Sequence, residues 1–188
     1  MSSKLLYKNS SAKDVQAFIG KVKNAALATC VDKGRLIFAM DATASREHCW
    51  DMASQKHAAM FAEADKVSAL SVQLCYYRGM GDFTTLPWTR GADEIKHALL
   101  SVRCLAGQTQ IAKVLAHALS ETRTSKVNAL VFVGDCVEEN PDSLTALAGQ
   151  LGILNLPLFV FQEGKNPKVG SIFAQLATLS GGAHCQFD

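Results

Sequence analysis

Two short stretches of the chain are continuously apolar, and each ends in an aspartate. Residues 35–41 read RLIFAMD, and residues 127–135 read VNALVFVGD. Runs without alternation between apolar and polar positions predict strands that are covered on both faces, as in a parallel sheet. Two further strands are predicted over residues 67–79 and 156–164.

A shorter strand is predicted within residues 79–89, which read GMGDFTTLPWT. Pro87 cannot donate a hydrogen bond to a ladder, so we expect this strand at an edge of the sheet.

Apolar residues at helical spacing fill the segments between these strands. The predicted helices cover residues 12–30, a segment after Ser45 that carries a stripe from Trp50 to Ala64, and residues 92–104, 111–121, 141–152 and 169–182. The alternation of strands and helices predicts an α/β fold: a doubly wound, mostly parallel central sheet with one short antiparallel edge strand, flanked by helices. We expect residues 1–33 to form a helical extension packing on a domain of residues 34–188.

Composition and charge remove several classes of function. The net charge is +2 and the basic residues are scattered, so neither nucleic acid nor a membrane surface is expected as a partner. The longest apolar run, residues 151–161, is far shorter than a membrane span, and the start of the chain lacks the apolar stretch of a signal peptide. We therefore expect a cytoplasmic protein with reduced cysteines, which show no Cys-x-x-Cys pair.

Oxygen-bearing side chains follow the two aspartate-ending strands. Asp41 is followed by Thr43 and Ser45, and Asp135 closes the later strand. Ligands of doubly wound sheets bind beyond the carboxyl ends of the strands, so we expect these side chains to meet there. Two adjacent carboxylates repel each other unless a cation lies between them, and Mg²⁺ prefers such hard oxygens. Thr109, after the turn-forming Gly107, is a further candidate.

This order of motifs resembles the von Willebrand factor type A family. Asp-x-Thr-x-Ser follows the first strand, Gly-x-Thr precedes a helix, and Asp closes a later strand, while residues 172–188 resemble the family's last helix, Gly-Gly turn and final strand. The resemblance covers roughly residues 34–188 and is closest to small, single-domain intracellular members of bacterial type. It implies a metal-ion-dependent adhesion site in which five residues bind Mg²⁺ or Mn²⁺, directly or through water: Asp41, Thr43, Ser45, Thr109 and Asp135.

The resemblance also implies a function without catalysis. An open position on the cation would capture an Asp or Glu of a protein partner, in an accessory or assembly role, with Gln108, Cys136 and Glu138 on the partner-binding rim. The sequence departs from the family pattern at two places. Thr43 stands where Ser is more common, and Cys136 follows Asp135 where Gly is more common.

Simpler roles are open for the same residues. Asp41 or Thr109 would also suit a helix cap, and Asp135 a solvated loop. Residues 138–142 are acidic and predict a solvated turn and helix start, with added negative potential at the rim as the functional alternative. A zinc or nucleophilic role is open for His48, Cys49 and Cys136, although no further ligand or base is identifiable.

Three alternatives concern function and assembly. A haloacid-dehalogenase-like phosphotransferase also begins with a strand-end Asp, but it needs a second acid where this chain has Thr43. A scaffold with a vestigial metal site is the other alternative. Met80 and Trp88 are either partner contacts or core residues, and a second copy would find docking places at the edge strand around Phe83 or at the leading helix.

Overall fold

The computed structural model describes residues 12–27, 34–46 and 70–187 of the 188-residue chain. The strands are β1 (Arg35–Asp41), β2 (Ser71–Arg78), β3 (Asp82–Thr85), β4 (Ala129–Gly134), β5 (Leu158–Glu163) and β6 (Ala183–Phe187). The helices are α1 (Ala12–Leu27), the short 3₁₀ helix η1 (Ala44–Arg46), α3 (Ala92–Ser101), α4 (Ile111–Thr124), α5 (Pro141–Ile153) and α6 (Pro167–Ser180).

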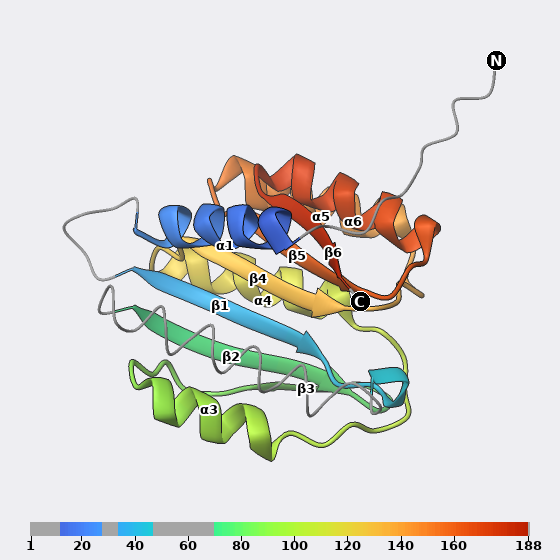
Figure 1. Cartoon of the computed structure of the whole chain (residues 1–188), viewed down its shortest axis with the longest axis horizontal. Helices are drawn as coiled ribbons and strands as arrows, with labels where there is room; N and C mark the ends of the chain where they lie inside the picture. The colour runs from blue at the N-terminus through green and yellow to red at the C-terminus, as the bar shows by residue number, and fades with distance from the viewer. Residues whose placement is uncertain (1–11, 28–33, 47–69, 188) are drawn as a thin grey trace.

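The strands form one six-stranded sheet in the order β3-β2-β1-β4-β5-β6 (Figure 1). All neighbouring pairs are parallel except β2 and β3, which are antiparallel. The predicted fold class, including the antiparallel edge strand, is therefore confirmed. The two aspartate-ending strands, β1 and β4, are direct neighbours at the centre of the sheet.

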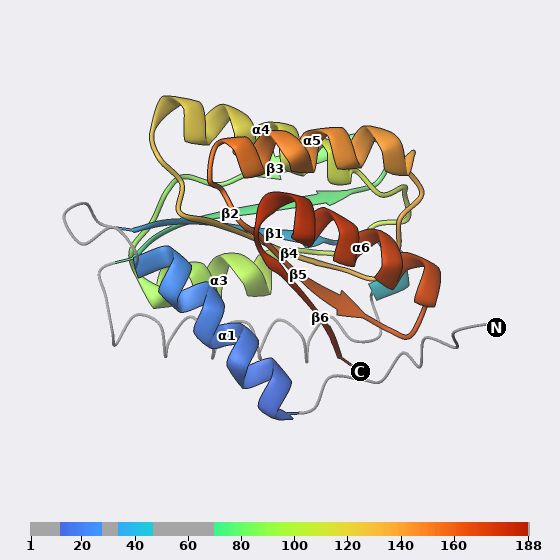
Figure 2. The same ribbon diagram turned by 90° about the horizontal axis from the view of Figure 1, so that it is seen from above.

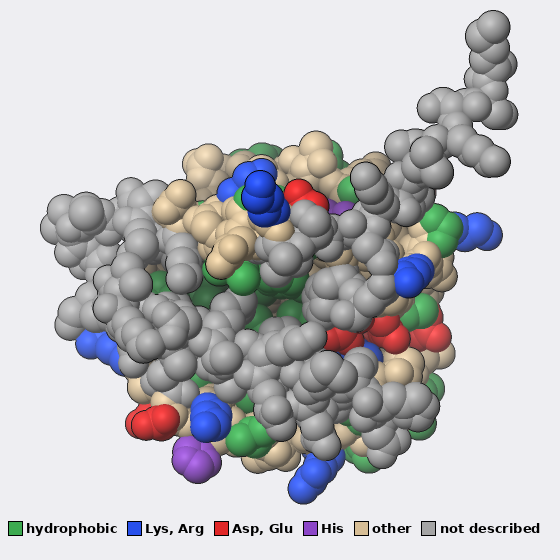
Figure 3. Space-filling model, in the orientation of Figure 1, with side chains coloured by type: hydrophobic (Ala, Val, Ile, Leu, Met, Phe, Trp, Pro, Cys, Tyr) green, Lys and Arg blue, Asp and Glu red, His purple; other side chains and the backbone are tan. Residues whose placement is uncertain are grey.

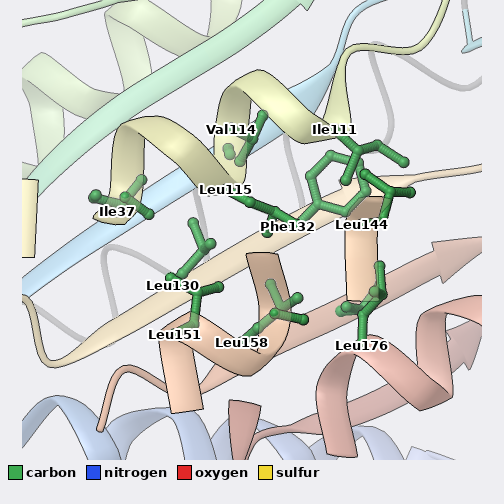
Figure 4. Close-up of a cluster of buried hydrophobic side chains, with 14 of the residues drawn as sticks. Ile37, Ile111, Val114, Leu115, Leu130, Phe132, Leu144, Leu151, Leu158 and Leu176 are labelled. Carbon is green, nitrogen blue, oxygen red and sulfur yellow. The ribbon is translucent and has the colours of Figure 1, made fainter. Parts of the chain in front are cut away.

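Both faces of the sheet are covered, which explains the continuous apolar runs. Figure 2 shows the sheet between α4 and α5 on one side and α1 and α3 on the other. Along β1, Ile37 packs toward α4, α5 and α6, whereas Phe38 packs on the side of α1 and α3. Figure 4 shows the first of these clusters, in which Phe132 of β4 lies among leucines and isoleucines from the helices. Burial of these side chains, at about 1.5–3 kcal/mol each, holds the strand ends in fixed positions.

α1 contributes to the core of the other face. Phe18 is buried and its ring packs edge-on against Phe159 and Phe161 of β5, with centroid distances of 5.6 and 4.3 Å. The helix lies close to β4 and β6. The division of the chain at residue 33 stays a prediction, since residues 28–33 lie outside the described ranges.

Local signals set the ends of the last two helices. Asn140 caps α5 by accepting a hydrogen bond from Asp142 N at 2.8 Å, and Pro141 occupies the first turn. α6 ends at Gly181, whose φ of 78° requires the left-handed region that glycine adopts freely. The predicted helix after Ser45 lies largely outside the described residues. No helix within the described ranges combines the length and the apolar character needed to cross a bilayer.

Candidate functional site

Two carboxylates meet where β1 and β4 end. Asp41 is the last residue of β1, and Asp135 directly follows β4. The strands are parallel and in register, with Met40 opposite Val133. Gly134 has no side chain, and a methyl group there would lie 3.6 Å from Asp41 Cβ. The absence of a side chain at Gly134 leaves room for Asp41 beside the β4 backbone.

Asp41 is completely buried and held by two donors. Its Oδ1 accepts a hydrogen bond from Thr43 N at 2.7 Å, and its Oδ2 accepts one from the Tyr77 hydroxyl at 2.9 Å. Burial raises the pKa of Asp41 above its ordinary value, although these hydrogen bonds and the charge of Arg46 act in the opposite direction. An ionised Asp41 therefore benefits from further positive charge nearby.

The hydroxyls of Thr43 and Ser45 lie side by side after Asp41. Their oxygens are 3.1 Å apart, within hydrogen-bond distance. Thr43 is buried and Ser45 is exposed, so the pair extends from the interior to the surface. The 3₁₀ turn η1 produces this arrangement, with Arg46 N donating to Thr43 O at 3.1 Å.

Thr109 is bonded to the loop that carries Asp135. Thr109 N donates to Glu138 Oε2 at 2.8 Å, and Glu138 N donates to Thr109 Oγ1 at 3.0 Å. This reciprocal pair brings the third motif beside the end of β4. Thr109 does not cap α4, because Gln110 is the N-cap residue and its side chain makes no capping bond.

Glu139 caps α4 instead, from a distant part of the sequence. Its two carboxylate oxygens accept hydrogen bonds from Ile111 N at 2.7 Å and Ala112 N at 2.8 Å. Charge on the carboxylate also suits the positive end of the helix dipole. The prediction of a merely solvated acidic turn is therefore wrong for Glu138 and Glu139, because backbone N–H groups of the neighbouring loop take up their carboxylates.

Asp135 leaves one buried oxygen without a protein partner. Among the residues that the structure describes, none donates a hydrogen bond to Asp135 Oδ1. A buried, unpaired carboxylate oxygen is costly, so a cation or water at this point would stabilise it. The prediction of a freely solvated loop carboxylate does not hold for this atom.

The chemistry of the donors suits a hard cation. Two carboxylates and three hydroxyls offer oxygen only, which Mg²⁺ and Mn²⁺ accept. The half-buried thiol of Cys136 lies near these groups, and burial together with the charges of Asp135 and Glu138 raises its pKa. That thiol stays protonated at neutral pH and is a poor ligand or nucleophile. Nowhere in the described ranges do three His, Cys, Asp or Glu side chains form a metal-binding group, so a cation here depends on the hydroxyls.

The rim predictions divide by exposure. Gln108 and Glu138 are exposed, and Cys136 is half-buried. Figure 3 shows acidic side chains gathered on the side where β1 and β4 end in Figure 1. The remaining candidates, His48 and Cys49, lie outside the described residues.

Three features of this end of the sheet are not predicted by the sequence motifs. Tyr77 of β2 holds Asp41, and the buried side-chain oxygen of Gln110 has no partner among the described residues. Arg46 forms a buried ion pair with Glu163 at the end of β5, through Nε–Oε2 at 2.7 Å and Nη2–Oε1 at 2.8 Å. The signal for that pair was present in the sequence, because Glu163 ends an apolar run as the two aspartates do.

Comparisons with known proteins agree on the fold. No protein-family model matches the chain, and no curated protein does. An aerotolerance-related membrane protein from Bacteroides fragilis, solved with multiple mutations to serines, superposes with a TM-score of 0.66 and 16% identity, over 82% of this chain and 91% of that chain.

Two further solved structures carry the family name. A von Willebrand factor type A structure from Catenulispora acidiphila has a TM-score of 0.66 and 16% identity, over 84% of this chain and 39% of that chain. The SpRpn10 VWA domain has a TM-score of 0.64 and 15% identity, over 81% of this chain and 87% of that chain. At these identities the likeness shows the fold, and the fold is that of von Willebrand factor type A domains.

Proposed function

We propose that this chain, with its von Willebrand factor type A-like fold, is a metal-dependent protein-interaction domain. Mg²⁺ or Mn²⁺ would bind to Asp41, Thr43, Ser45, Thr109 and Asp135, and an acidic side chain of a protein partner would complete the coordination. The unpartnered, buried Oδ1 of Asp135 carries this proposal, because it is aligned with no donor among the described residues.

The mixture of donors explains how the site would attract an acidic partner. Three of the five side chains are neutral hydroxyls, so two carboxylates leave a divalent cation with unused affinity for negative charge. The exposed hydroxyl of Ser45 marks the side from which a partner would approach. The reciprocal hydrogen bonds of Thr109 and Glu138 would keep the third motif in position.

The same geometry argues against a phosphotransferase of the haloacid-dehalogenase type. That chemistry uses the strand-end aspartate as an exposed nucleophile, whereas Asp41 is fully buried and both of its oxygens accept hydrogen bonds. Thr43 cannot act as the second acid. We therefore propose an interaction module without catalytic activity. A cytoplasmic location and a possible homo-oligomer stay predictions.

Calorimetric titration of the chelator-stripped protein with Mg²⁺ and with Mn²⁺ tests the proposal. We expect saturable binding to the unaltered chain and its loss in Asp135→Ala. Asp93→Asn is the matched control, because Asp93 is an exposed carboxylate in the first turn of α3. Absence of binding by the unaltered chain, including to Ca²⁺, would overturn the proposed function. Partner binding that survives chelation would instead support the scaffold with a vestigial metal site.

A further inference from the structure

Two large apolar side chains are exposed on the loops beside the candidate site. Met80, in the turn between β2 and β3, is 79% exposed, and Leu105, in the loop between α3 and α4, is 49% exposed. We call these two residues the apolar rim. Exposed apolar side chains that lie together mark interaction surfaces more often than single ones do.

Leu105 is built into the end of the sheet. Its N–H donates to Ala42 O at 3.1 Å, its carbonyl accepts from Gly79 N at 3.5 Å, and it forms a parallel bridge with Thr43. The backbone of Leu105 therefore lies where β1 and β2 diverge, next to a hydroxyl of the candidate metal site. The apolar rim and the candidate metal site are parts of one surface.

The loops that carry the apolar rim are tightly packed on each other. A methyl group on Gly107 would lie 2.0 Å from Gly79 O, so the two backbones are in direct contact. Gln108 N donates to Gly79 O at 3.3 Å, and Gln110 Nε2 donates to Arg78 O at 3.3 Å. An apolar surface on such fixed loops is preorganised, which lowers the entropy cost of binding.

Basic residues surround the apolar rim. Lys113 Nζ donates to Gly81 O at 2.9 Å, directly beside Met80, and Arg78 donates to the backbone of the exposed Arg103 at 3.2 Å. The carboxylates of the acidic loop lie instead beside Thr109 and the start of α4. Charge complementarity on the rim side of the site therefore favours a partner segment that is acidic rather than basic.

We infer that the apolar rim sets the partner sequence: an extended segment with an acidic residue and a large apolar residue two positions away. Side chains at alternate positions of an extended chain point to the same side. The acidic residue would therefore reach the cation while the apolar residue covers Met80 and Leu105. This inference rests on the proposed function, because the cation binds the acidic half of the segment.

A peptide array tests the inference on the full chain in Mg²⁺. Each peptide carries a fixed central Glu, with every amino acid placed in turn at the neighbouring positions. We expect the unaltered chain to prefer Leu, Ile, Phe or Met two positions from Glu. The double variant Met80→Ser/Leu105→Ser should lose about tenfold in binding to those peptides, the equivalent of one lost apolar contact, and keep its Mg²⁺ binding. Ile153→Ser is the control, because Ile153 is 80% exposed at the end of α5.

The outcomes separate this inference from the proposed function. An unchanged apolar preference in the double variant, binding to Glu without any apolar preference, or no bound peptide would overturn the inference, even with Mg²⁺ titration intact. Apolar preference that persists in chelator would overturn the proposed function and the acidic half of the segment. Urea unfolding of each variant verifies that the chain is folded in every comparison.

Discussion

Arg46 is almost completely buried, at 1% exposure, although its guanidinium carries a full charge. It forms two hydrogen bonds with the carboxylate of Glu163 and one with the backbone carbonyl of Asp41. β4 lies between β1 and β5, so this pair spans the central strands at the edge where the candidate site lies. The pair therefore fixes the position of the turn that carries Thr43.

Breaking this pair should strongly destabilise the fold. Arg46→Met leaves the Glu163 carboxylate buried without its cation, and we expect the free energy of unfolding to fall by about 3–5 kcal/mol. The double variant Arg46→Met/Glu163→Met removes both charges and should lose clearly less. Urea unfolding followed by circular dichroism measures both values. A double variant as unstable as the sum of the single variants would contradict this account.

At the scale of single residues, sequence motifs predicted which side chains come together and missed how they are held. Asp41, Thr43 and Asp135 could be chosen because each follows a predicted strand. The Tyr77 hydroxyl on Asp41 and the capping of α4 by Glu139 depend on contacts between segments that are distant in sequence. No local pattern specifies such contacts, because they follow from strand order and loop packing.

At the scale of elements, the loop between α3 and α4 depends on a close backbone contact. Gly107→Ala would place a methyl group against Gly79 O, and we expect a loss of about 1–3 kcal/mol. Gly149→Ala is the matched control within α5, where a methyl group meets nothing within 4 Å. There we expect a gain of about 0.5–1 kcal/mol, because alanine favours a helix. Equal effects of both changes on urea unfolding would argue against the proposed contact.

The elements themselves were well predicted from the hydrophobic pattern. The run over residues 35–41 coincides with β1, and the other strands and helices lie within the predicted segments. Continuous apolar runs are informative because both faces of the sheet are covered. The pattern could not predict the bridge between Thr43 and Leu105, since an exposed leucine in a loop has no periodic signal.

At the scale of the whole molecule, two half-buried histidines link stability to pH. His117 Nε2 lies 2.8 Å from Gln73 Oε1, and His184 Nε2 lies 2.9 Å from Gln162 Oε1. Burial lowers the pKa of both histidines below the ordinary value of 6.5. The unfolded chain therefore binds more protons below pH 6.5, and the folded state loses stability as the pH falls from there through the folded pKa values.

Replacing both histidines should flatten this dependence. We expect the free energy of unfolding of His117→Gln/His184→Gln to fall less than that of the unaltered chain between about pH 7 and pH 5. His97→Gln, on the exposed surface of α3, is the control. Asp41, whose pKa is raised by burial, contributes in the opposite direction, but it is common to all the variants and cancels in the comparison. Parallel curves for all three proteins would contradict the assignment.

The pairing of β1 with β4 also has a consequence for the order of folding. Asp41 and Asp135 are distant in sequence, and the strands, turns and helices between them must be synthesised before the two strand ends meet. Contacts of this separation form late, because a long loop must close first. A nascent or partly unfolded chain therefore lacks the two-carboxylate arrangement altogether. A partner that binds through the cation would select chains in which the central strands are already paired, so that binding itself would act as a check on folding.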